Sequence, residues 1–404
     1  MKALFLTREY PPNVYGGAGV HVEYLSQELA KLIEVEVRCF GNQNAKNGNL
    51  TVRGIDFDPK AFATCDKKLK SPFTSFANCI QFNAEPIDAQ LVHCHTWYSH
   101  FGGILAQKAY GIPMVLTTHS LEPSRPWKRE QLGLGYDLSV WVEKTAMESA
   151  DAIIAVSKGM KDDVTRMFNV DPNRVHVIYN GIDIQEYQFN PATDALIEYG
   201  VDPNVPYVLF VGRITRQKGI IHLVNAIKHI DPRAQIVLCA GEPDTPEIRA
   251  EMEAGVRVAQ QHRDNIRWIP EMVPKKKIIQ LYSHAAVFCC PSIYEPFGII
   301  NLEAMACKTP VVGSAVGGIV EIIQHGKTGF LVEFDQYKQS PFEPVNPEQF
   351  SKQLADSINQ ILTNDTLRKE MGENSRRRVE ERFSWASIAR EVLALYTRLV
   401  ESRK

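Results

Sequence analysis

Two cations stand in a short loop bounded by glycines, Arg213 and Lys218 between Gly212 and Gly219. The loop follows an apolar run at 207–211 that is typical of a buried strand. An arginine can hold a phosphate through two hydrogen bonds and a lysine adds a point charge, so together they can neutralise a departing diphosphate. The loop therefore predicts a diphosphate site, with a solvated basic turn as the alternative.

Two carboxylates, Glu295 and Glu303, follow the next motif, a strand-like run at 286–290 that leads into the loop 291–298. On one helix they would be about 12 Å apart along the axis, beyond the roughly 5 to 9.5 Å between the two carboxylates of a glycosidase. We therefore expect them to hold different parts of one ligand, Glu295 the sugar hydroxyls and Glu303 the ribose hydroxyls. Phe297 and Gly298 in the same loop are counted among the donor contacts.

A glycine-rich loop, with Gly16, Gly17 and Gly19, lies between a strand-like run at 3–7 and a helical run at 20–32. Glycines let the backbone approach a ligand closely, and the helix N-terminus offers free amides to a phosphate. The same glycines are also what a tight turn requires. Phosphate binding and a turn alone are equally good interpretations of this loop.

Histidine and basic residues follow the other strands of the first half. His93-Cys94-His95 has ligand types that suit zinc but no second pair at metal spacing, so we expect His95, with Trp97, to pack or to line the acceptor site. The basic loop Arg125, Lys128 and Arg129 is either solvated or binds an anionic acceptor such as glucose 1-phosphate. We expect no metal and no cofactor.

The elements that must position these residues form two α/β series. In the first, strands are expected near 3–7, 35–40, 90–93, 113–117, 152–156 and 175–178; in the second near 207–211, 235–240, 266–269, 286–290, 310–313 and 329–332. Helical stretches alternate with them, which is typical of doubly wound parallel sheets. The segment 180–206 is expected to be the hinge, and residues from 347 onward to be helical. Ligands should bind in a cleft at the carboxyl ends of the strands.

Composition limits the classes of protein. A length of 404 residues favours two domains, and a net charge of -2 gives no reason to expect nucleic acid. The eight cysteines are scattered and read as small buried hydrophobes in a reducing compartment. Neither a signal peptide nor a membrane span is apparent, so a cytoplasmic enzyme with no membrane partner is expected.

These motifs together resemble retaining glycosyltransferase family 4. The spacing Glu295 to Glu303 is similar to the family's Glu-x7-Glu signature, and the loop 212–219 matches its phosphate loop. The stretches 8–12, 15–19 and 126–131 resemble short bacterial glycogen synthases that use ADP-glucose. The resemblance covers almost the whole chain and implies a GT-B fold, with a final helix near 383–399 returning to the first domain.

The resemblance also implies roles. Arg213 and Lys218 hold the donor diphosphate, Glu295 the glucose and Glu303 the ribose, while His119, after the strand-like run 113–117, lies beside the sugar. The longer glycogen synthases carry Lys-Thr-Gly-Gly where this chain has residues 14–17, Val-Tyr-Gly-Gly, so their lysine is absent. The family usually retains configuration by front-face attack, with the leaving phosphate taking the acceptor's proton.

The resulting prediction is an enzyme that transfers glucose from ADP-glucose to the 4-position of an α-glucan. Domains are expected at 1–185 with 385–404, on the acceptor side, and at 186–384, on the donor side. The alternatives are a maltose 1-phosphate synthase that uses glucose 1-phosphate as acceptor, another family 4 transferase, or a nucleotide-sugar-binding regulator without turnover. An NAD-dependent oxidoreductase is disfavoured because no Gly-x-Gly-x-x-Gly is followed by an acid at the usual distance.

Overall fold

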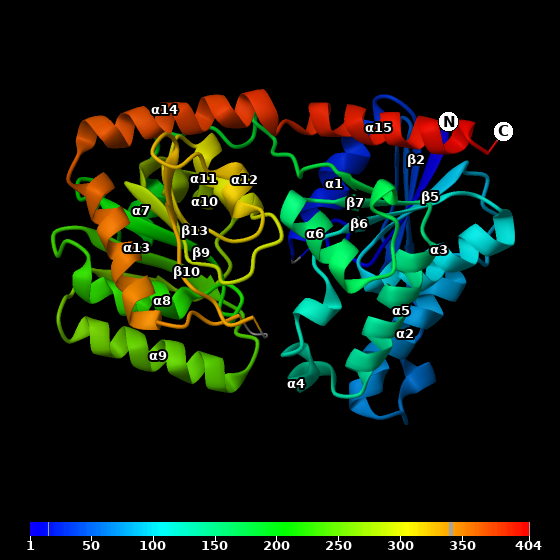
Figure 1. The fold of residues 1–404 in the computed structure, drawn as a ribbon, viewed down its shortest axis with the longest axis horizontal. Coiled ribbons are helices and arrows are strands. Elements are labelled where there is room, and N and C mark those ends of the chain that lie inside the picture. The colour runs from blue at the N-terminus through cyan, green and yellow to red at the C-terminus, as the bar shows by residue number, and fades with distance from the viewer. Residues whose placement is uncertain (15, 339–341, 404) are drawn as a thin grey trace. The chain divides into compact units, whose positions relative to one another are not determined.

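The computed structural model describes residues 1–14, 16–338 and 342–403 (Figure 1). Tyr15 of the glycine-rich stretch lies outside the described residues. The chain divides into two compact units, unit 1 with residues 1–181 and 385–404, and unit 2 with residues 182–384. The expected boundary after residue 185 thus lies four residues beyond the one in the structure. Among the described residues, no helix is long and apolar enough to cross a bilayer.

Unit 1 is an eight-stranded sheet in the order β3-β4-β2-β1-β5-β6-β7-β8, in which only β3 and β4 pair antiparallel. Its strands are β1 (Lys2–Thr7), β2 (Glu34–Phe40), β3 (Asn44–Asn47), β4 (Leu50–Ile55), β5 (Leu91–His95), β6 (Met114–Thr118), β7 (Ala152–Ala155) and β8 (Val175–Val177). Its α-helices are α1 (Gly17–Ala30), α2 (Lys67–Gln81), α3 (Trp97–Tyr110), α4 (Lys128–Leu132), α5 (Gly135–Ser149), α6 (Lys158–Met167) and α15 (Trp385–Glu401). Short 3-10 turns lie at Pro59–Phe62, Glu122–Ser124 and Pro172–Arg174.

The sheet of unit 1 has an apolar core on each face. One core contains α1 and α15, and the other contains α2, α3, α5 and α6. Burial on both faces explains why the central strands are continuous apolar runs rather than alternating ones. The last helix, drawn in red in Figure 1, lies beside α1 although almost the whole chain separates them in sequence.

Unit 2 is a six-stranded parallel sheet in the order β11-β10-β9-β12-β13-β14. Its strands are β9 (Tyr207–Arg213), β10 (Gln235–Gly241), β11 (Ile266–Ile269), β12 (Val287–Cys290), β13 (Val311–Ser314) and β14 (Gly329–Val332). Its α-helices are α7 (Asp194–Glu198), α8 (Ile220–Ala226), α9 (Pro246–Gln260), α10 (Lys275–His284), α11 (Ile299–Ala306), α12 (Ile319–Ile322), α13 (Pro347–Leu362) and α14 (Asp365–Arg382), with a 3-10 turn at Ile227–His229. Two doubly wound sheets are therefore confirmed.

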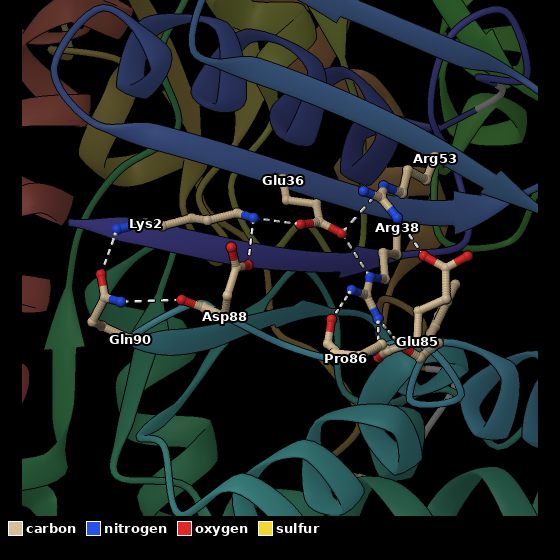
Figure 2. A network of polar contacts seen from close by, with 9 residues as sticks. Lys2, Glu36, Arg38, Arg53, Glu85, Pro86, Asp88 and Gln90 are labelled. Carbon is tan, nitrogen blue, oxygen red and sulfur yellow. Dashed lines mark hydrogen bonds and ion pairs between the residues drawn. The ribbon is translucent and has the colours of Figure 1, made fainter.

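An ion network with Glu36 and Arg38 buried at its centre links the first strands of unit 1 (Figure 2). Lys2 Nζ lies 2.8 Å from Glu36 and 2.5 Å from Asp88, and Arg38 Nε donates to Glu36 at 2.8 Å. Burial opposes ionisation of Glu36, but hydrogen bonds from Lys2 and Arg38 outweigh it and lower the pKa of this carboxyl. Arg38 also donates to the carbonyls of Phe82, Glu85 and Pro86. The network fixes the segment before β5 against β2.

Candidate functional site

The predicted donor residues lie at the point where the strand order of unit 2 reverses. From β9 the chain goes first to β10 and β11 on one side, and then to β12, β13 and β14 on the other. Arg213 ends β9, Lys218 follows in its loop, and Glu295 lies in the loop after β12. Parallel sheets of this kind bind ligands at the carboxyl ends of the strands beside this reversal.

Lys218 and Glu295 come together in the structure. Lys218 Nζ lies 2.6 Å from Glu295 Oε2, and the two side chains are 20% and 7% exposed. Ser292 Oγ donates to the same carboxylate oxygen at 3.2 Å. The loops that carry them touch because Gly219 has φ +59, and a Cβ there would lie 2.1 Å from the carbonyl oxygen of Pro291. Only glycine fits this contact.

Arg213 lies apart from this pair and has another partner. Its side chain is 44% exposed, and Nη1 lies 3.4 Å from Oδ1 of Asp244 in the loop after β10. Gly212, next to Arg213, lies close to the ring of Phe210. A Cβ on Gly212 would lie 3.2 Å from this ring. Sequence reasoning missed Asp244, because a lone aspartate after a strand carries no signal.

Glu303 lies inside α11 and is fixed by two tyrosines. Tyr187 and Tyr282 donate to its two oxygens at 3.1 and 2.9 Å. Burial raises the pKa of Glu303, and the two tyrosine hydrogen bonds partly oppose this. An ionised carboxylate has about four acceptor sites, so the two tyrosines leave part of the acceptor capacity of Glu303 unused.

The loop between the two glutamates is rigidly packed. Gly298 has φ +101 and is the N-cap of α11, while Phe297 is buried and packs edge-on to Phe383 with centroids 6.1 Å apart. The glycine pair Gly317 and Gly318, which sequence reasoning missed, supports Glu295. Gly318 donates to the Glu295 carbonyl at 2.9 Å, and a Cβ on Gly317 would lie 2.0 Å from that oxygen. A glycine pair after a strand was the available signal.

The glycine-rich loop of unit 1 already binds a carboxylate of the same chain, that of Glu9. The amide of Gly16, which caps α1, donates to Glu9 Oε2 at 3.0 Å. Gly19 lies so close to Glu9 that a Cβ would meet its carboxylate at 2.8 Å, and Gly17 begins the helix. A phosphate at this helix end would compete with Glu9.

Histidines gather at the strand reversal of unit 1, between β1 and β5. His95 ends β5, His119 follows β6, and His95 Nδ1 lies 3.2 Å from His119 Nε2. His21 of α1 joins them, with its ring 4.7 Å from that of His119. Burial lowers the pKa of all three, that of His21 to about 4. The rings are therefore neutral at pH 7, and the partly exposed ring of His119 can both donate and accept hydrogen bonds.

The expected acceptor residue Trp97 is buried. It is 2% exposed, stacks on Tyr98 with centroids 4.0 Å apart, and follows Thr96, which has φ +66. The guanidinium group of Arg8 lies over the ring of Tyr98, with Cζ 4.2 Å from the ring centroid. Trp97 therefore supports Tyr98 from within the unit.

The structure does not bring Arg125, Lys128 and Arg129 into one cluster. Lys128 Nζ lies 2.7 Å from the buried carboxylate of Glu122, and Arg129 pairs with Asp137 at the surface. Arg125 Nη1 instead donates to Ser120 Oγ at 3.0 Å, and its buried Nε has no hydrogen-bond partner. Of the three, only Arg125 has no carboxylate within ion-pair distance among the described residues.

A second buried carboxylate supports this loop. Glu143 Oε2 accepts a hydrogen bond from the Glu122 amide at 2.7 Å, and Ser139 donates to Glu122 Oε2 at 3.0 Å. Burial, with the nearby Glu122, raises the pKa of Glu143 well above its usual value. The backbone that carries Arg125 is thus held by polar contacts on the side facing the core.

The chain is similar to known glycosyltransferases along its length. Residues 15–186 match the model of Glycosyltransferase Family 4 and residues 195–340 that of Glycosyl transferases group 1. An alpha-maltose-1-phosphate synthase of Mycolicibacterium smegmatis is 47% identical over 99% of this chain and 100% of its own. The protein of that name in Mycobacterium tuberculosis is 44% identical over 99% and 100%.

Solved structures share the fold. Sucrose-phosphate synthase from Thermosynechococcus elongatus has a TM-score of 0.78 at 24% identity, with both chains fully covered. The catalytic domain of starch synthase IV from Arabidopsis thaliana, bound to ADP and acarbose, has a TM-score of 0.75 at 18% identity over 99% of each chain. The GT-B fold is thereby confirmed. The chain belongs to glycosyltransferase family 4 and is a hexosyltransferase that depends on a nucleotide sugar.

Proposed function

We propose that this enzyme transfers glucose from a nucleoside diphosphate glucose to glucose 1-phosphate, releasing maltose 1-phosphate and the nucleoside diphosphate. The observation that carries the proposal is the likeness, over full length, to two proteins named alpha-maltose-1-phosphate synthase. It favours the sugar phosphate acceptor over the α-glucan acceptor that the resemblance to glycogen synthases had suggested. ADP-glucose is the first donor to test, because the short motifs resemble enzymes that use it.

Unit 2, with residues 186–384 of the expected domain, is the proposed donor unit. Arg213 and Lys218 hold the diphosphate, Glu295 the glucose hydroxyls and Glu303 the ribose. The contact of Lys218 with Glu295 supports this assignment, since it places the cation for the phosphate next to the carboxylate for the sugar. Gly212, Phe297 and Gly298 shape the same loops, and Gly16, Gly17 and Gly19 remain proposed donor contacts through their amides.

Unit 1, with residues 1–185 and 385–404 of the expected domain, is the proposed acceptor unit. Glucose 1-phosphate brings a dianion, which needs a cation that no carboxylate of the chain already neutralises. Among the described residues, Lys128 and Arg129 each form an ion pair with a carboxylate, whereas Arg125 forms none, so Arg125 is the proposed phosphate contact. The neutral ring of His119 lies six residues before Arg125 and is the proposed contact for the reacting sugar, with His95 behind it.

Transfer then follows with retention of configuration. The 4-hydroxyl oxygen of the acceptor forms the new bond to the anomeric carbon on the face that the diphosphate leaves. The bond from that carbon to the phosphate oxygen breaks, and the phosphate oxygen takes the hydroxyl proton. Arg213 and Lys218 stabilise the negative charge on the leaving group, so their effect is greatest in the transition state.

The test measures release of nucleoside diphosphate from ADP-glucose and from UDP-glucose, each with glucose 1-phosphate, with glycogen, and with no acceptor. We expect release with glucose 1-phosphate and a disaccharide phosphate as product. Arg125→Gln should raise the KM for glucose 1-phosphate by about 10- to 150-fold, the equivalent of one charged hydrogen-bond pair. Arg129→Gln is the matched control and should leave this KM unchanged. Faster release with glycogen than with glucose 1-phosphate would refute the proposal.

A further inference from the structure

Three histidines from three elements of unit 1 converge in a geometry that the transfer reaction does not require. His21 of α1, His95 at the end of β5 and His119 after β6 each offer a ring nitrogen, and the three nitrogens lie within 4.8 Å of one another. We call these residues the histidine cluster. His21 and His95 are buried, and His119 is half-buried. The cluster therefore reaches the surface through His119.

Two nitrogens of the histidine cluster have no partner. His21 Nδ1 lies 2.6 Å from the amide oxygen of Asn180, which can only accept, so Nδ1 carries the proton and Nε2 keeps a free lone pair. That Nε2 is buried without a hydrogen bond, as is Nε2 of His95. A buried nitrogen left without a partner is unfavourable, and a cation that accepts its lone pair would satisfy it.

The surroundings also suit a metal ion. Asn180 fixes the orientation and tautomer of His21, as residues behind metal ligands commonly do. His93 is excluded as a ligand, since Tyr396 and Thr117 occupy its nitrogens at 2.5 and 2.7 Å. The zinc pattern considered in His93-Cys94-His95 thus gives way to ligands that are distant in sequence.

We propose that His21, His95 and His119 bind a divalent transition-metal ion of the zinc type. Three neutral imidazoles with one open position are a known ligand set for Zn²⁺. The ion replaces the 3.2 Å contact between His95 Nδ1 and His119 Nε2 with two metal–nitrogen bonds, and it gives the unpartnered Nε2 of His21, but not that of His95, a partner. Binding also removes His119 from the sugar, so Zn²⁺ inhibits transfer. This inhibition, unlike the binding itself, rests on the proposed function.

The binding test uses the full chain without a histidine tag, stripped with EDTA and titrated with Co²⁺. Visible absorption reports the coordination, and Zn²⁺ competition gives the affinity. We expect one ion per chain, and at least about 100-fold weaker binding in His21→Phe, which lacks one of the three ligands. His100→Leu is the matched control, because His100 is equally buried but lies outside the histidine cluster, and it should bind like the wild type.

Circular dichroism at neutral pH establishes that both variants are folded. Absence of Co²⁺ absorption in the folded wild type at millimolar metal would overturn the proposal, and so would equal binding by His21→Phe. In the activity assay, Zn²⁺ should inhibit the wild type, EDTA should reverse this, and any activity of His21→Phe should not respond. Metal binding without any transfer would refute the proposed function and leave the metal site standing.

Discussion

Replacing His100 by leucine should reduce the loss of stability of the protein at acid pH. His100 lies in α3, is 1% exposed, and neither ring nitrogen has a hydrogen-bond partner. Burial lowers the pKa of its ring from 6.5 to about 3. In the unfolded chain the ring takes up a proton below about pH 6.5, whereas in the folded chain it stays neutral down to about pH 3.

The sign follows from this difference in bound protons. Above about pH 6.5 His100 adds no pH dependence, and below it the unfolded state gains stability from protonation, so the folded state loses stability as the pH falls. The slope approaches about 1.4 kcal/mol per pH unit, and at pH 5 the accumulated loss is about 2 kcal/mol. His100→Leu removes this contribution because leucine does not titrate.

Urea unfolding at pH 7.5, 6 and 5, followed by tryptophan fluorescence, measures the effect. Four of the five tryptophans, residues 97, 127, 141 and 385, belong to unit 1, so the signal reports mainly on the unit that contains His100. Between pH 7.5 and pH 5 the variant should lose about 2 kcal/mol less than the wild type. His262→Gln, at an exposed histidine, is the control and should follow the wild type. Parallel profiles for His100→Leu and the wild type would refute the reasoning.

Three further changes test other parts of the structure. Glu36→Gln leaves Arg38 buried without its carboxylate and should lower the free energy of unfolding by about 3 to 5 kcal/mol at pH 7, as measured by urea denaturation; a loss below about 1 kcal/mol would contradict the burial of the pair. Gly317→Ala places a methyl group 2.0 Å from the Glu295 carbonyl and should reduce kcat/KM strongly, whereas Gly326→Ala, at a similar φ but with nothing within 4 Å, should leave it nearly unchanged. Arg213→Ala should lower kcat by about 100-fold or more with little change in melting temperature, and near-normal turnover would remove Arg213 from the proposed mechanism.

Much of the fold followed from hydrophobic patterning. Every expected strand has a counterpart, because strands buried on both faces are apolar runs that a single sequence displays. The pair β3 and β4 was missed, since β3 is exposed along its whole length and three of its four residues are polar. The segment 180–206 looked like a hinge because of its glycines and prolines, yet from residue 182 it belongs to unit 2. The amide of Ala195 there donates to Gln280 of α10, a contact between residues that are distant in sequence.

The candidate donor site was easier to predict than the candidate acceptor site for a physical reason. A cation at a strand end is visible in the sequence, and Lys218 does lie beside Glu295. Whether a cation is available to a ligand depends on its counter-charge, and the sequence does not show which carboxylates are nearby. Lys128 has Glu122 as its partner and Arg129 has Asp137, so three similar residues divide into two that are neutralised and one that is not.

The sequence also does not show which histidine nitrogens already have hydrogen-bond partners. His93 and His95 have the same side-chain type and the same strand, and both are fully buried. What separates them is their partners, since Tyr396 of the last helix and Thr117 of β6 occupy both nitrogens of His93, whereas His95 contacts another ring of the histidine cluster through Nδ1 and its Nε2 has no partner. A residue some 300 positions away thus decides which histidine can bind a ligand. The residue type shows which ligands a side chain could bind, and the hydrogen bonds made in the folded protein determine which of these side chains is still available to bind one.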